Sequence, residues 1–154
     1  MRRLSPAAAC GLAGALAFLA LVPTTQAQLP WQPFNFLRPI GRMDLAQVPE
    51  CSGLVQSLRY KGVFWALSDS GNPADIVPIT ADGKLASRWS GPVRVEGVRN
   101  YDWEDLALDA KGNLIIADVG NNRGRRKQLM LHFVKEPKPG MTSVRPDRTL
   151  RVHY

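Results

Sequence analysis

The residues of this chain that are best placed to do chemistry are three carboxylates close together in the sequence, Asp102, Glu104 and Asp105. They lie in the segment Asn-Tyr-Asp-Trp-Glu-Asp at residues 100–105, directly before an apolar run. Carboxylates at this spacing repel one another unless a cation, arginines or water offsets their charge. Oxygen ligands of this kind suit Ca²⁺, or Mg²⁺ that keeps more of its water. The segment is therefore a candidate site for a divalent cation.

Three more acidic residues are candidates for the same site. Asp69 and Asp118 each begin an Asp-x-Gly-Asn signature, in which Asp either reaches a ligand or stabilises its own turn. Glu50 precedes an apolar strand, near the position that corresponds to Glu104 in the second half of the chain. We take Glu104, Asp102 and Glu50 as candidate metal ligands, and Asp69 and Asp118 as candidate ligand-binding residues.

A basic run, Asn-Asn-Arg-Gly-Arg-Arg-Lys, occupies residues 121–127. Its first arginine, Arg123, is a candidate ligand-binding residue, because Arg grips phosphate and carboxylate groups through two parallel hydrogen bonds. Alternatively, the run is a solvated loop, or Arg123 pairs with the acidic segment. No aromatic residues are interleaved with it, so nucleic acid is not an expected partner. No nucleophile, phosphate-loop or zinc motif is present, and the sequence assigns no catalytic residue.

The elements that position these residues repeat at an interval of about fifty residues. In each repeat a short apolar strand, a turn and a second apolar strand lead to the Asp-x-Gly-Asn signature. A period of this length with strands inside it is typical of propellers, solenoids and arrays. Further strands are expected at residues 75–80, 85–90, 128–135 and 149–154, with a tight turn at 81–84 and no helical period after residue 27. The predicted class is all-β, with about two propeller-type blades.

Two blades do not close a ring, since propellers have about four to eight. We therefore expect residues 50–154 to be a partial propeller, as the N-terminal part of a longer protein. The rival interpretation is that two such halves dimerise. Residues 28–49, which begin rich in Pro and aromatic side chains, are expected to form an extended arm.

Residues 1–27 have the pattern of a secretory signal peptide. Arg2 and Arg3 precede an apolar run, and Thr-Gln-Ala at residues 25–27 is a small-x-small cleavage site. The apolar run is about 16 residues, short of the roughly 20 that span a bilayer. We expect a periplasmic or secreted protein with no stable membrane span after cleavage. Cys51 would then be the one cysteine of the mature chain, and a buried structural thiol is the expected role.

The composition is that of an ordinary globular protein. The chain has 154 residues, of which 45% are hydrophobic and 21% charged, with a formal net charge of +7. This balance argues against a disordered chain and allows one domain at most. Because only one true basic run exists, the charge indicates a mildly basic surface more than a polyanion-binding protein.

Four motifs resemble secreted bacterial β-propeller proteins, which are similar in plan to the gluconolactonase/regucalcin-like, NHL-like, SdiA-regulated and esterase-like-phytase propellers. The motifs are Ser-Gly-Leu at 52–54, Trp-x-Leu-x-Asp-Ser-Gly at 65–71, Asp-Trp-Glu-Asp-Leu-Ala at 102–107 and Asp-Val-Gly-Asn-Asn at 118–122. The resemblance covers about residues 50–137 and implies acidic residues around a channel cation, with Glu104 and then Glu50 as ligands by position. Such proteins usually repeat the Asp-x-Glu step in a later blade, which this chain does not reach.

Three functions follow as hypotheses. In the first, a channel cation held partly by Glu104 polarises an ester, lactone or phosphoester toward water. In the second, the same channel binds a small molecule or a protein without turnover. In the third, the chain is a truncated remnant without activity. Fold resemblance alone does not choose among them, because related propellers differ in function.

Overall fold

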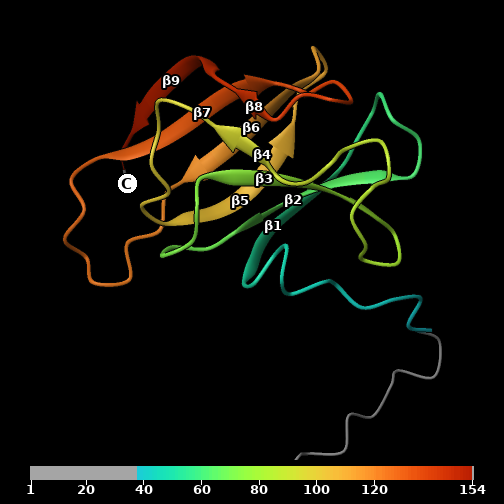
Figure 1. Cartoon of the computed structure of the whole chain (residues 1–154). Helices are drawn as coiled ribbons and strands as arrows, with labels where there is room; N and C mark the ends of the chain where they lie inside the picture. Colours follow the sequence, from blue (N-terminus) through green and yellow to red (C-terminus); the bar gives the residue numbers. More distant parts are fainter. Residues whose placement is uncertain (1–37, 154) are drawn as a thin grey trace, which may run out of the picture. The chain divides into compact units, whose positions relative to one another are not determined.

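The computed structural model describes residues 38–153 (Figure 1). These residues form nine β-strands in two sheets and no helix, which confirms the all-β prediction for the described part. Accordingly, this part has no apolar helix long enough to cross a membrane. The expected signal peptide, residues 1–27, and the first part of the expected arm lie outside the described residues.

The first sheet follows the chain for four strands and is joined at its far edge by a short strand from later in the sequence. Neighbouring strands run antiparallel, except that the edge strand β8 runs parallel to β4. The order is β1 (Cys51–Gln56), β2 (Val63–Ser68), β3 (Asp75–Thr80), β4 (Val93–Val95) and β8 (Ser143–Val144).

The second sheet is an antiparallel meander of four strands. Its order is β5 (Trp103–Leu108), β6 (Asn113–Asp118), β7 (Leu129–Lys135) and β9 (Pro146–Val152). Burial alternates strictly along β6, as expected of a strand with one face on the core. The first strand pair of each sheet, β1–β2 and β5–β6, carries one of the two repeats found in the sequence, and each pair has a register shift near its start.

One predicted strand is absent. Residues 85–90 were expected to complete a hairpin with β3, but only an isolated bridge joins Ile79 to Leu85. The turn itself forms as predicted, with the Lys84 carbonyl accepting from the Thr80 N–H. The ladder stops because Pro78 has no N–H to donate, and because Trp89 turns into the core, where it is 3% exposed. The short strand β4 pairs with β3 instead.

The two sheets share one hydrophobic core and meet where β1 packs against β5. Trp65 and Trp103, one from each sheet, are fully buried in this core. At the meeting of the strands, the Ser52 hydroxyl donates to the Trp103 carbonyl at 2.7 Å. Gly53 is required there, because a Cβ would stand 2.8 Å from the backbone nitrogen of Leu106. This close contact brings the end of β2 beside the start of β5.

A buried carboxylate provides a second connection between the sheets. Glu136, directly after β7, accepts hydrogen bonds from the Ser57 hydroxyl and from the Trp65 indole N–H, the latter at 2.8 Å. Ser57 and Trp65 both belong to the β1–β2 hairpin of the first sheet. Burying Glu136 is tolerable because both bonds are made to its carboxylate.

Candidate functional site

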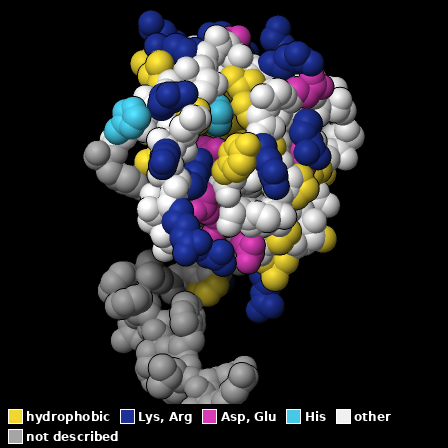
Figure 2. Space-filling model, turned by 90° about the vertical axis from the view of Figure 1, so that its left-hand side faces the viewer, with side chains coloured by type: hydrophobic (Ala, Val, Ile, Leu, Met, Phe, Trp, Pro, Cys, Tyr) yellow, Lys and Arg dark blue, Asp and Glu magenta, His cyan; other side chains and the backbone are white. Residues whose placement is uncertain are grey.

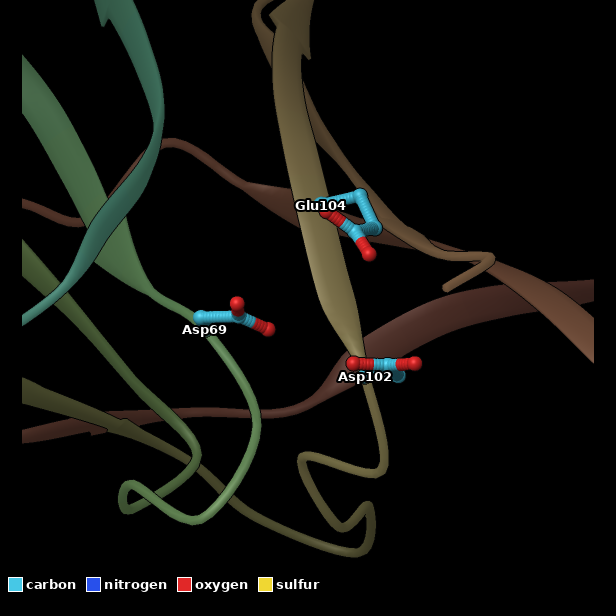
Figure 3. Close-up of side chains that lie close together, drawn as sticks. All are labelled: Asp69, Asp102 and Glu104. Atoms are coloured by element: carbon cyan, nitrogen blue, oxygen red, sulfur yellow. The ribbon is translucent and has the colours of Figure 1, made fainter. Parts of the chain in front are cut away.

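Three carboxylates gather where the sheets meet, from Asp69, Asp102 and Glu104 (Figure 3). One oxygen of each lies within 4.8 Å of one oxygen of the other two. Asp69 directly follows β2 and points toward β5, while Asp102 precedes β5 and Glu104 lies on it. Asp102 is buried, and the other two side chains are half-buried. We call these three residues the carboxylate cluster.

The cluster is electrostatically frustrated in the absence of a cation. Burial raises the pKa of Glu104, and the negative charges of Asp69 and Asp102 raise it further. Asp102 is 8% exposed, and its Oδ1 has no hydrogen-bond partner among the described residues. A buried carboxylate oxygen without a donor is costly unless a cation neutralises it. The three carboxylate ligands and the oxygen of Asp102 that lacks a hydrogen-bond partner both fit a hard divalent cation.

A buried asparagine clamps the two sides of the cluster together. The Asn100 side-chain amide donates to the carbonyl oxygens of Ser68 and Asp69, both at 2.9 Å. Its Oδ1 accepts from the Trp103 N–H at 3.1 Å. The end of β2 is therefore held against the start of β5 by three hydrogen bonds from one side chain. Asn100 is not recognisable as a clamp from the sequence, because the residues whose carbonyls it binds are about thirty positions away.

Gly120 forms the floor of the cluster. A Cβ at this position would stand under 3.0 Å from Cγ and Oδ2 of Asp102 and from Oε1 of Glu104. Its N–H donates to the Asp102 carbonyl at 3.0 Å. The second Asp-x-Gly-Asn signature therefore has its glycine because two carboxylates approach the backbone there. Spacing within the sequence showed the signature without showing this contact.

Asp118 lies beneath the cluster and is completely buried. Its Oδ1 accepts from the Asp102 N–H at 3.0 Å and pairs with the Arg126 guanidinium at 2.8 Å. Arg126 also donates to the Gly120 carbonyl at 2.7 Å. Asp118 thus joins the segment before β5 to the segment after β6, which goes beyond the turn-stabilising role considered from the sequence. For Asp69 the turn contact is present, since its carboxylate accepts from the Ser70 N–H.

Glu50 and Arg123 lie outside the carboxylate cluster. The exposed Glu50 carboxylate accepts from the Asn72 side chain at 3.1 Å, and its backbone carbonyl accepts from the Asp69 N–H at 2.9 Å. Arg123 is exposed and lines a hollow that Asp102 also lines. Within residues 38–153 the ion pair near the cluster is made by Arg126 and not by Arg123. The sequence analysis had not singled out Arg126.

A buried histidine, also without a role in the sequence analysis, lies on the other side of Asp118. His132 is 5% exposed, and its Nδ1 is 3.0 Å from the Thr149 hydroxyl. Its Nε2 is 3.9 Å from Oδ2 of Asp118. The three residues come from the adjacent strands β6, β7 and β9, so the sheet places them on one face.

The expectation of a buried structural thiol is wrong. Cys51 is exposed at the start of β1, where its thiol donates weakly to the Gly53 carbonyl at 3.5 Å. A register shift in the β1–β2 ladder lies between Cys51 and Gly53. Partial burial raises the pKa of the thiol, which disfavours the reactive thiolate.

No protein-family model, curated protein or solved structure matches this chain. The case for a function consequently depends on the geometry of the carboxylate cluster and its surroundings.

Proposed function

We propose that this chain is an exported β-propeller segment, periplasmic or secreted, that binds a divalent cation through Asp69, Asp102 and Glu104. The observation that carries the proposal is the convergence of the three carboxylates within 4.8 Å, one of them buried with an oxygen that has no hydrogen-bond partner within residues 38–153. A cation would offset the repulsion that raises the pKa of Glu104 and would give the unpaired oxygen of Asp102 a partner.

Calcium is the preferred ion. It accepts six to eight oxygen ligands in flexible geometry, whereas Mg²⁺ demands near-ideal octahedral geometry and loses its water reluctantly. Three carboxylates, each binding through one oxygen, would leave at least three positions for water and for a ligand. Those positions suit a site that recruits a small molecule or a protein to the ion.

Two features support the propeller part of the proposal. Each sheet begins with a meander of successive antiparallel strands, β1 to β4 and β5 to β7, as blades do. The first strands of the two sheets, β1 and β5, pack against each other, which is the arrangement of inner strands in neighbouring blades. The cluster would then lie at the channel mouth between the two blades.

Calcium titration of the full chain by isothermal calorimetry tests the proposal. We expect one ion per chain, with a Kd of about 0.1–1 mM, as in extracellular calcium modules. Glu104→Gln should weaken binding at least tenfold, because it removes one charged ligand. Asp105→Asn is the matched control, since Asp105 is the exposed neighbour of Glu104 on the same strand and is not part of the cluster. Equal losses in both variants, or no binding, would refute the site.

Hydrolysis of an ester, lactone or phosphoester is the catalytic form of the same proposal. It is favoured by the coordination positions that the three carboxylates leave for water and substrate. Turnover of p-nitrophenyl acetate and p-nitrophenyl phosphate that requires calcium and is lost in Glu104→Gln would establish it. Calcium binding without turnover of any such ester would favour the ligand-binding module.

A further inference from the structure

A hollow of about 540 Å³ lies directly beside the carboxylate cluster. Asp102 belongs to both the cluster and the lining of the hollow. The other lining residues are Ser70, Tyr101, Asn121, Asn122 and the three arginines Arg123, Arg125 and Arg126. A volume of this size is typical of small-molecule sites. The polar lining favours a polar ligand over an apolar one.

The arginines are presented by a closed turn. Asn121 organises this turn, because its Oδ1 accepts from the Arg126 N–H at 2.8 Å. Its backbone carbonyl accepts from the Gly124 N–H, also at 2.8 Å. Gly124 has a φ of +62°, a conformation that glycine adopts without strain. The loop is thus held in place before any ligand arrives, which reduces the entropy cost of binding.

Two of the three arginines are available for a ligand. Arg126 is already engaged, since it pairs with Asp118 and donates to backbone carbonyls. Arg123 and Arg125 are exposed, and neither has an ion-pair partner in the part of the chain that the structure describes. On the face shown in Figure 2, Lys and Arg side chains border recessed acidic side chains. Among the residues that line the hollow, Asp102 is acidic and three are arginines.

An anion matches this charge pattern once the cation is bound. A divalent cation on three ionised carboxylates leaves a local charge of −1, whereas Arg123 and Arg125 together contribute +2. An oxyanion can use one oxygen as a ligand to the cation and accept hydrogen bonds from guanidinium groups with the others. A neutral or cationic ligand would leave both arginines unpaired.

We propose that the hollow binds the oxyanion group, carboxylate or phosphate, of a small polar ligand between the cation and the side chains of Arg123 and Arg125. This inference rests on the proposed cation site and specifies the class of ligand that the site takes. In this assignment, Arg123 and Arg125 of the basic turn recognise the ligand. Arg126 supports the carboxylate cluster through its ion pair with Asp118, which accepts a hydrogen bond from the Asp102 N–H.

Calorimetric titration with benzoate and with phenyl phosphate, two probes that differ in their anionic group, tests the inference on the full chain. Each probe is titrated in saturating calcium and in excess EGTA. We expect at least one probe to bind, and only in calcium. The probe that binds more tightly identifies the source of the oxyanion. The double variant Arg123→Gln/Arg125→Gln should weaken that binding about tenfold, since two partly exposed ion pairs are lost.

Calcium affinity should stay within about twofold of wild type in this double variant, because neither arginine touches the cluster. Arg59→Gln/Arg88→Gln, two exposed arginines elsewhere, is the control for net charge and should bind the probe as wild type does. If calcium binds and neither probe does, or if probe binding survives the loss of Arg123 and Arg125, the inference is overturned and the cation site stands. Absence of calcium binding in the wild type overturns both.

Discussion

Replacing Glu104 by Gln removes one charge from the carboxylate cluster and keeps the shape of the side chain. We expect this variant to be more stable than wild type at pH 7 when calcium is absent. Burial and the charges of Asp69 and Asp102 raise the pKa of Glu104, so the folded chain holds the proton of Glu104 more tightly than the unfolded chain does. Ionisation of Glu104 therefore destabilises the fold as pH rises above about 4. Gln cannot ionise and avoids this loss.

The size of the gain follows from the separation of the charges. Because Glu104 is half-buried, the dielectric constant of water gives a lower bound on the repulsion. Two unit charges at 4.8 Å, the upper limit of the separations in the cluster, then repel each other by about 0.9 kcal/mol. Two such neighbours, reduced by salt screening, give roughly 1–2 kcal/mol. For a chain of 154 residues, the midpoint of thermal unfolding should rise by about 3–6 °C.

Thermal unfolding followed by circular dichroism, in EGTA and between pH 4 and pH 8, measures the gain. It should be largest at pH 7–8 and shrink toward pH 4, where Glu104 is protonated in both states. Saturating calcium should cancel most or all of the gain, because a tenfold weaker affinity for the ion costs the variant about 1.4 kcal/mol of stability relative to wild type. Asp105→Asn should not reproduce this pH dependence. An equal gain at pH 4 and pH 7, or the same gain in the control, would refute the electrostatic argument.

Three further predictions concern other parts of the fold. Gly120→Ala should weaken calcium binding about a hundredfold in calorimetric titrations, because the new Cβ displaces two carboxylates by more than calcium–oxygen bond lengths tolerate. Gly91→Ala is the control: a Cβ at this position meets nothing within 4 Å in the described part of the chain, and calcium binding should be unchanged. Glu136→Ala should lower the free energy of unfolding, measured in urea, by about 2–4 kcal/mol, because the Ser57 hydroxyl and the Trp65 indole N–H lose their acceptor. Glu136→Gln keeps an acceptor oxygen and should lose less, so equal losses in the two variants would contradict the prediction. Cys51 should react with iodoacetamide more slowly at pH 8 than free cysteine does, because burial raises its pKa, and an equal rate would show that the thiol is fully solvated.

Local sequence patterns were enough to predict most strands. The strands expected at residues 75–80 and 128–135 were placed within one residue of the observed bounds of β3 and β7. Such patterns depend on the alternation of side chains along one strand and on turn residues at its ends. The failure at residues 85–90 has the same origin, because alternation does not reveal that Pro78 ends the ladder or that Trp89 belongs to the core.

The candidate site was predicted in part. Asp102 and Glu104 were taken together as candidate metal ligands because they are two residues apart in the sequence, whereas Glu50 was preferred to Asp69 as the third candidate. Asp69 precedes Asp102 by thirty-three residues, and only the packing of β1 on β5 brings the two carboxylates together. Arg126 was missed for the same reason, since its partner Asp118 lies across a turn that the sequence does not specify.

The amino-acid sequence by itself determined the all-β class, the repeat of about fifty residues and the acidic segment before β5, because each is a pattern of residue types along the chain. Only the tertiary structure decided which carboxylates lie together, which arginine pairs with Asp118 beside them and which arginines line the hollow. Those choices depend on contacts between residues far apart in the chain. Their free energies come from burial and from electrostatics in three dimensions, which no local pattern encodes.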